Sequence, residues 1–203
     1  MQLTELLNLL SQLESKEKCL AFAAACSERL IPIYFAYCKQ ASFPPDFVSE
    51  SREFLWSLAL PPSPVCPSLI ERIDRLESLT PDPDQSDYFL VNCAANAVSA
   101  IQSAFQYYET DELDNVVKSS QLAIATIDEY IGRVDFPQSK EFSETSWFHA
   151  WARNHPLLME EVERQRKDLE ILASSMTLND DVIRRIRKES ARCGIQPFRR
   201  GLL

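Results

Sequence analysis

The chain has 203 residues and a formal net charge of −9, and 45% of its residues are hydrophobic and 25% charged. This is the composition of a globular protein that is long enough to bury a core. Its acidity disfavours nucleic acid and favours a basic protein as a partner, although the same charge also serves plain solubility. Three glycines are too few for an all-β fold or a glycine-rich phosphate loop, so we expect helices.

The first third of the chain predicts three helices. Leucines at helical spacing from Leu3 onward indicate a short first helix, and an alanine-rich apolar run predicts a second helix over 16–41. Pro32 lies inside this second helix and removes one backbone donor, so we expect a kink one turn earlier, near Glu28. A third helix is expected over 47–60, after a proline turn.

Prolines mark the next stretch, and long helices follow it. Four prolines make 61–67 a stiff extended connector, and a short helix comes after it. The longest helix is expected over 88–109, where five alanines allow neighbouring helices to approach closely. Another long helix is expected over 111–132, and the short link between the two predicts a central antiparallel pair.

The last third begins with an irregular segment, 134–155, that contains several aromatic residues. Over 158–176, apolar residues then alternate spacings of four and three with one polar break at Gln165, which is the pattern of a heptad seam. A last helix after Asn179 carries its arginines toward its C-terminus, where cations are favoured. Together these elements predict one all-α domain over 1–203, a bundle of seven to nine helices.

The six cysteines are scattered, and no two of them form a CxxC pair. This pattern predicts reduced, mostly buried thiols and gives no support for a metal site. Glutamates interrupt the first leucines, unlike the core of a secretory signal, and we identify no apolar run of the ~18 residues that a membrane span requires. We therefore expect a cytoplasmic protein with no membrane contact, no metal and no cofactor.

The sequence carries no catalytic signature, and we predict no catalytic residue and lean away from an enzyme. Metalloprotease, nucleophile-elbow, phosphate-loop and dinucleotide motifs do not occur in it. A di-metal bundle needs a glutamate three residues before a histidine on two helices, but His149 and His155 follow no acid at that spacing. A cysteine–histidine pair has no local signature either, so buried structural cysteine is the better interpretation.

Two charged residues, Glu28 and Arg29, lie in the middle of the apolar second helix. They need partners, because burying an unpaired charge is costly. In the interpretation that we favour, Arg29 pairs with a carboxylate of the central pair, Asp87 or Asp128, and fixes the packing of the helices. In the alternative, the kink opens a pocket between 16–41 and 88–132. Its candidate polar groups are Glu28, Arg29, Tyr34 and Asp87.

Three further features are candidates for binding a partner. Acidic residues in two turns could meet a basic protein through fast, salt-sensitive association, namely Asp82, Asp84, Asp111, Glu112 and Asp114. Aromatic residues near the irregular segment either cover an edge of the core or anchor a partner, namely Trp147, Phe148 and Trp151. The seam over 158–176 could instead join two copies of the chain. The basic last helix lacks interleaved aromatics, so we do not expect nucleic acid there.

One set of residues resembles a known family. The stretch Cys26-Ser27-Glu28-Arg29-Leu30, with Pro32, Tyr34 and Trp56 after it, is similar to the pattern of the YjaG-like bacterial family (domain of unknown function, family 416). Asp87-Tyr88 before an alanine-rich helix, the run from Ser119 to Ile127 and the long helix from Glu160 to Met176 are similar too. The tail after Gly194 departs from the family's asparagine-containing ending. The resemblance implies an all-helical cytoplasmic bacterial protein and supplies no reaction, cofactor or catalytic residue.

These observations predict a non-catalytic module that binds a basic protein through its acidic middle third. Residues 77–148 hold 13 acids against 3 bases, and an immunity-type inhibitor is one concrete form of such a module. The alternatives are a small-molecule-binding protein or enzyme that uses the pocket beside Arg29, and a structural homodimer.

Overall fold

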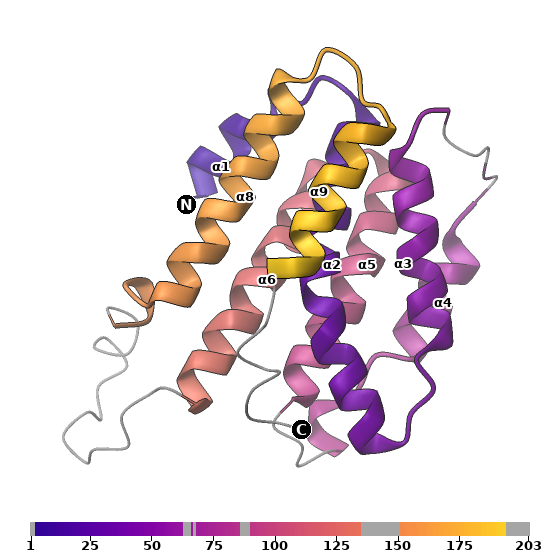
Figure 1. Cartoon of the computed structure of the whole chain (residues 1–203). Coiled ribbons are helices and arrows are strands. Elements are labelled where there is room, and N and C mark those ends of the chain that lie inside the picture. The colour runs from indigo at the N-terminus through magenta and orange to yellow at the C-terminus, as the bar shows by residue number, and fades with distance from the viewer. Residues whose placement is uncertain (1–2, 63–65, 67, 86–89, 135–150, 194–203) are drawn as a thin grey trace.

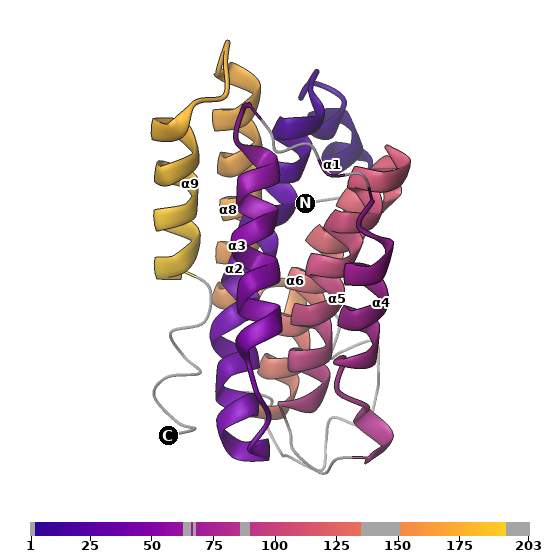
Figure 2. The ribbon, with the colours of Figure 1, turned by 90° about the vertical axis from the view of Figure 1, so that its right-hand side faces the viewer.

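The computed structural model describes the chain except residues 1–2, 63–65, 67, 86–89, 135–150 and 194–203. The described part is all-α, as predicted, and its helices pack side by side into a bundle (Figures 1 and 2). The elements are α1 Leu3–Leu10, α2 Lys16–Ala41, α3 Asp46–Ala59, α4 Ile70–Ser78, the 3-10 helix η1 Pro83–Gln85, α5 Val91–Thr110, α6 Leu113–Val134, α8 Pro156–Ser174 and α9 Asp180–Cys193. Most of the predicted connector 61–67 and irregular segment 134–155 lies outside the described residues.

Helix α2 is the axis of the bundle. Ser15 caps its start by accepting a hydrogen bond from the backbone N–H of Lys18 at 3.3 Å, and Ser42 ends it in a left-handed conformation with φ of 53°. The helix continues through Pro32. It packs against α3, α5, α6, α8 and α9, so most of its side chains are buried, charged ones included.

The predicted antiparallel pair is formed by α5 and α6. The left-handed backbone of Asp111, with φ of 58°, ends α5 and starts the return. Alanines on the core side of α5 are fully buried, namely Ala94, Ala97, Ala100 and Ala104. These small side chains let the helices approach closely, and Ser119 of α6 donates a hydrogen bond to the Ala100 carbonyl at 3.0 Å. The pair is central, but it shares that place with α2, which packs along both helices.

The predicted seam over 158–176 faces the chain's own core. Leu158, Leu169 and Leu172 are buried against the rest of the bundle, and only Met176, past the end of α8, is fully exposed. A second copy could use this face only if α8 were first unpacked, so the seam does not offer a dimer interface. The structural homodimer itself stays a prediction.

The expectation that no apolar run has the length of a membrane span was wrong for α2. Among the described residues, this one helix is long and apolar enough to cross a membrane by length and composition. However, 83% of the apolar window is buried inside the bundle, and the core helix of a globular protein passes the same test. Its hydropathy is explained by its central place in the fold.

Close packing around α5 predicts a large penalty for added volume. We expect Ala97→Leu to lower the free energy of unfolding by about 1–3 kcal/mol, because the added carbons must displace neighbouring helices. Chemical denaturation measures this loss. The same substitution at the exposed Ala191 of α9 serves as the control and should change stability by less than about 0.5 kcal/mol. Equal effects at both positions would contradict tight packing at α5.

Candidate functional site

Arg29 is 98% buried and joins three helices through its side chain. Its Nε donates to Glu161 Oε1 at 3.0 Å, and its Nη1 donates to Asp168 Oδ2 at 2.7 Å. Nη1 also donates to the Ser190 hydroxyl at 3.3 Å, and Nη2 to the Cys26 thiol at 3.3 Å. Since Glu161 and Asp168 lie on α8 and Ser190 on α9, this one guanidinium fixes both helices against α2.

The described partners of Arg29 differ from the predicted Asp128. Both carboxylates that bind it in the described part of the chain come from α8 rather than from the central pair, and Asp128 of α6 is not one of them. Asp87 lies outside the described residues. The polar break in the seam was the available signal: Gln165 stands between Glu161 and Asp168 on the buried face of α8. It donates to Glu161 Oε1 at 2.9 Å and accepts from the Ser120 hydroxyl at 2.6 Å.

The buried cluster carries unequal charges. One guanidinium faces two carboxylates, which leaves one negative charge in excess when both are ionised. Burial acts to lower the pKa of Arg29, but Glu161, Cys26 and Asp168 outweigh it and raise that pKa. Burial raises the pKa of Asp168; Arg29 only partly offsets this and Glu161 adds to it. Burial also raises the pKa of the Cys26 thiol to about 12, so the thiol is not a nucleophile.

Glu28 points away from this cluster and binds other helices. Trp56 of α3 donates its indole N–H to Glu28 Oε2 at 2.9 Å, and Arg52 donates to Oε1 at 3.5 Å. Arg187 of α9 lies 3.9 Å from Oε2. Both oxygens of Glu28 are therefore occupied by contacts that hold α3 and α9 against α2, and Glu28 does not form a pocket with Arg29.

Tyr34 is fully buried and does not line a site with Arg29. Its hydroxyl has no partner of hydrogen-bond geometry in the described part of the chain, although the Cys38 thiol lies close enough to influence it. Burial first, and Cys38 second, raise the pKa of this hydroxyl. A neutral phenol of this kind is a core residue with an imperfect polar contact.

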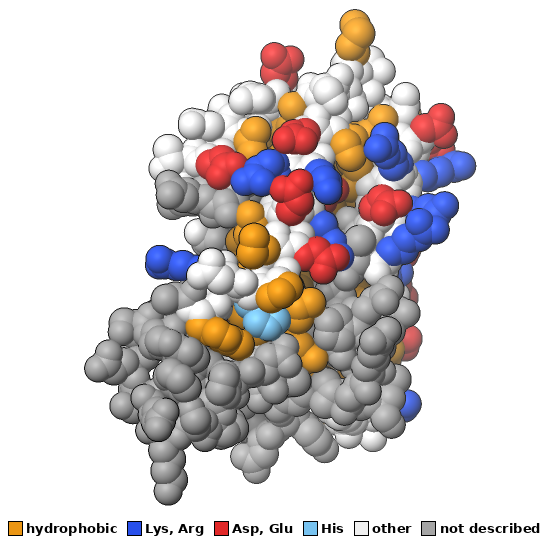
Figure 3. Space-filling view, turned by 60° about the vertical axis from the view of Figure 1, so that its left-hand side comes forward, with side chains coloured by type: hydrophobic (Ala, Val, Ile, Leu, Met, Phe, Trp, Pro, Cys, Tyr) orange, Lys and Arg blue, Asp and Glu red, His pale blue; other side chains and the backbone are white. Residues whose placement is uncertain are grey.

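A groove of about 410 Å³ does lie beside Arg29, but on the opposite side from the predicted pocket, between α8 and α9. We call it the α8–α9 groove. Its floor is formed by Arg29, Asp168 and Ser190, all of which are more than nine-tenths buried. Acidic and basic side chains alternate on the face over these two helices (Figure 3). The remaining lining residues are Glu160, Glu163, Arg164, Lys167, Ile171, Arg185 and Glu189.

Most charges on the rim of this groove are neutralised by neighbours. Arg164 donates to Glu160, Lys167 lies 3.5 Å from Glu163, and Glu189 lies 3.5 Å from Arg192. Arg185 is the exception: it is exposed, and the described residues offer it no ion-pair partner. The rim as a whole holds three acids and three bases, and Arg185 is its one base without an ion-pair partner in the described chain. The buried cluster at the floor has one negative charge in excess when both carboxylates are ionised.

Two floor groups keep unused hydrogen-bonding capacity. The hydrogen bond from Arg29 goes to Asp168 Oδ2, and no described residue donates to Oδ1. The Ser190 hydroxyl accepts from Arg29, and within the described chain it makes no donation to the preceding turn of the kind that Ser27 makes to Ala23. One acceptor and one donor are thus available at the bottom of the groove. No sequence motif identifies these two groups as a site, because they lie on different helices and come together only when α8 packs beside α9.

The five acidic residues predicted to face a basic partner do not form one surface. Asp82 and Asp84 precede α5, whereas Asp111, Glu112 and Asp114 follow it. Because α5 has 20 residues, the two groups are ~30 Å apart along its axis. Asp111 is also paired with Lys16 at 2.7 Å.

Of the predicted aromatic anchors, Trp147 and Phe148 lie outside the described residues. The half-buried ring of Trp151 packs on His155, with ring centroids 5.1 Å apart.

No group of three or more potential metal ligands occurs among the described residues.

The known proteins that resemble this chain show its fold but give no activity. The family model DUF416, described as a protein of unknown function, matches residues 5–196. The crystal structure of a DUF416 family protein from Shewanella baltica OS155 superposes with a TM-score of 0.78 at 23% identity, over 91% of this chain and 94% of that one. No curated protein matches the chain.

The buried cluster predicts that Arg29 is a strong stability determinant. We expect Arg29→Met to lower the free energy of unfolding by about 3–5 kcal/mol, because two buried carboxylates lose their counter-charge. Burial raises the pKa of Asp168, and Arg29→Met removes the charge that partly offsets this rise. The penalty should therefore grow as the pH rises from the unfolded pKa of about 4 toward the raised folded pKa, and should be smaller at lower pH. Denaturant unfolding at several pH values measures both effects.

Arg166→Met provides the control for this prediction. Arg166 also pairs with two acids, Glu5 and Glu163, but it lies at the surface of α8, where water screens its charge. We expect a much smaller loss of stability that is nearly independent of pH. A loss as large as that of Arg29→Met would contradict the special role of the buried cluster.

Proposed function

The chain belongs to the DUF416 family, whose description names no activity, and we propose that it is a non-catalytic protein that binds a small zwitterion in the α8–α9 groove. By zwitterion we mean a molecule with one cationic amine and one carboxylate, an α-amino acid being the simplest case. The ammonium group would lie at the floor and the carboxylate at the rim.

The observation that carries this proposal is a rim arginine without an ion-pair partner that lies above a buried cluster with an excess carboxylate. The buried cluster around Arg29 has one carboxylate more than it needs, and Arg185 on the rim has no ion-pair partner in the described chain. A ligand with a single charge would satisfy one end and leave the other unmatched. A zwitterion complements both, and charge-assisted hydrogen bonds of this kind are about twice as strong as neutral ones.

The floor supplies the contacts that an ammonium group and its neighbours require. Asp168 Oδ1 can accept from the ammonium group, and the Ser190 hydroxyl can donate to a neighbouring oxygen. A cavity of about 410 Å³ lies toward the small end of ligand sites in proteins. Ile171 is the one apolar side chain among the lining residues, and the others are charged or polar, so a ligand with charged groups suits the groove.

This proposal favours the small-molecule alternative over the predicted binding of a basic protein. The five acidic residues are divided between two ends of α5, so no single surface concentrates their charge. An immunity-type role and a cytoplasmic location stay predictions that rest on composition.

The sharpest test combines ligand analogues with one rim substitution. We expect calorimetric titration with a panel of α-amino acids to detect saturable binding, and the matching amine and carboxylate of each to bind more weakly. Arg185→Ala should weaken binding of the zwitterion about tenfold, since one charge-assisted contact is lost.

Lys188→Ala is the matched control. It removes the same charge from an exposed site on the same helix, but Lys188 does not line the groove. We expect it to leave the affinity unchanged. Absence of binding to any member of the panel, or equal losses in the two variants, would overturn the proposal.

Asp168 predicts a pH dependence of binding. Burial raises its pKa, and a ligand ammonium group beside it favours the charged carboxylate, so affinity should fall as the pH drops through that pKa. We expect weaker binding in acidic solution than at neutral pH, because burial moves the pKa of Asp168 upward from its ordinary value. Asp168→Asn should bind weakly at every pH and yet fold, since Arg29 keeps Glu161 as a counter-charge. An unchanged pH profile in Asp168→Asn would contradict this assignment.

A further inference from the structure

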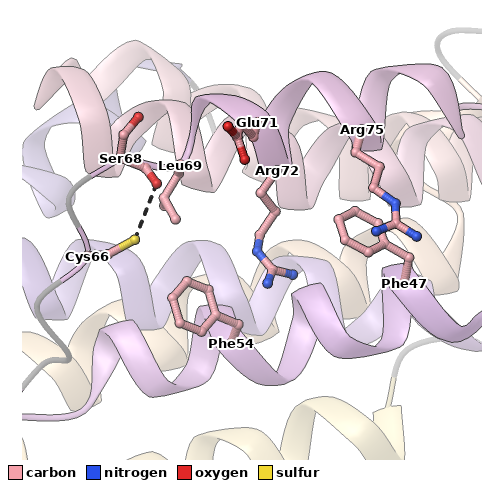
Figure 4. Close-up of a pocket in the computed structure, with 8 residues that line it drawn as sticks. All are labelled: Phe47, Phe54, Cys66, Ser68, Leu69, Glu71, Arg72 and Arg75. Atoms are coloured by element: carbon pink, nitrogen blue, oxygen red, sulfur yellow. Dashed lines mark hydrogen bonds between the residues drawn. The ribbon is translucent and has the colours of Figure 1, made fainter.

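A second groove, of about 330 Å³, lies between α3 and α4 (Figure 4). We call it the arginine–phenylalanine groove. Helix α4 lies on the opposite side of the bundle from α9, so this groove is separate from the α8–α9 groove (Figure 2). Two arginines of α4, Arg72 and Arg75, point toward two phenylalanines of α3, Phe47 and Phe54.

Both guanidinium groups are positioned by aromatic rings. The guanidinium carbon of Arg75 lies 3.9 Å from the ring centroid of Phe47. That of Arg72 lies 4.9 Å from Phe54 and 5.2 Å from Phe47, and its Nη1 donates to the buried Ser51 hydroxyl at 3.1 Å. Arginine stacks on an aromatic face through its plane, which leaves N–H groups at its edges free to donate.

The pairing is unexpected because this acidic chain offers many carboxylates. Glu71 precedes Arg75 by four residues in α4, a spacing at which ion pairs form on helices. Even so, the described residues supply no ion-pair partner to Arg72 or Arg75. The nearby Glu109 carboxylate accepts instead from the backbone N–H of Leu69, before α4 begins. Two oriented positive charges therefore line the groove without an ion-pair partner among the described residues.

We propose that the arginine–phenylalanine groove binds the phosphoryl group of a small molecule through Arg72 and Arg75. A phosphoryl dianion matches two positive charges, and its terminal oxygens can accept from both guanidinium forks. A carboxylate carries one charge and needs only one fork. Glu71 also lines the groove and opposes the anion, so it limits the affinity. Phe47 is a positioning residue, because its ring holds the Arg75 guanidinium at the groove.

Titration of the full chain tests this proposal with inorganic phosphate and phenyl phosphate as probes, at constant ionic strength set with chloride. We expect saturable binding of phosphate, which calorimetry and phosphorus NMR line broadening can both measure. Tighter binding of phenyl phosphate would assign the site to phosphate esters, and tighter binding of inorganic phosphate would assign it to the free ion. Absence of saturable binding by both probes would overturn the proposal.

Substitutions locate the binding and separate charge from geometry. Arg75→Ala should weaken phosphate binding about tenfold. Arg75→Lys should also weaken it, since lysine keeps the charge but loses the planar fork, while Glu71→Gln should strengthen it. Phe47→Leu should weaken binding without any change in charge. Full affinity in Arg75→Ala would overturn the proposal.

The two grooves serve as controls for each other. Arg185→Ala should leave phosphate binding unchanged, and Arg75→Ala should leave binding of the zwitterion unchanged. Failure of one proposal is therefore distinguishable from failure of the other. Equal loss of phosphate binding in Arg75→Ala and Arg185→Ala would indicate a general charge effect and would overturn the assignment to this groove.

Discussion

The arrangement of α8 and α9 depends on the charge of one buried side chain. Arg29 is inside the bundle because α2 is its axis, and a guanidinium at that depth is tolerated only when acceptors surround it. Its acceptors come from α8, α9 and one turn of α2 itself. The polar positions on the buried face of α8 follow from this requirement, and they explain why the heptad pattern of that helix is broken at Gln165.

The two adjacent charged residues of α2 bind different sets of neighbouring helices. Successive residues of an α-helix point ~100° apart, so Glu28 and Arg29 reach different neighbours. Glu28 binds Trp56 of α3 and lies near Arg187 of α9, while Arg29 binds α8 and Ser190 of α9. Helix α9 is thus held from both sides by polar contacts, with Ile183 and Ile186 as its buried apolar residues. Attachment by charge, with few apolar side chains to fill space, leaves the groove between α8 and α9 open.

The two proposed sites follow from the same physical principle. In both grooves, an arginine without an ion-pair partner among the described residues lines a cavity, so its charge is available to a ligand. Arg185 is such a group beside the buried cluster, and Arg72 and Arg75 are such groups on the rings of α3. Their surroundings differ, and this difference sets the ligand chemistry. A nearby excess carboxylate selects a zwitterion, whereas two neighbouring cations select a dianion.

The sequence by itself determined the helical class, the central pair and the burial of Arg29, because hydrophobic spacing, turn residues and the cost of an isolated charge are local properties. The polar positions of α8 are also visible in the sequence, but the sequence does not show which residue they bind. Only the tertiary structure decided that Glu161 and Asp168, more than 130 residues away, are partners of Arg29, and that Arg185 finds no carboxylate in the described part of the chain. Which carboxylate reaches a given guanidinium depends on how helices are placed side by side. That placement is set by the packing of the whole core, and no single stretch of sequence encodes it.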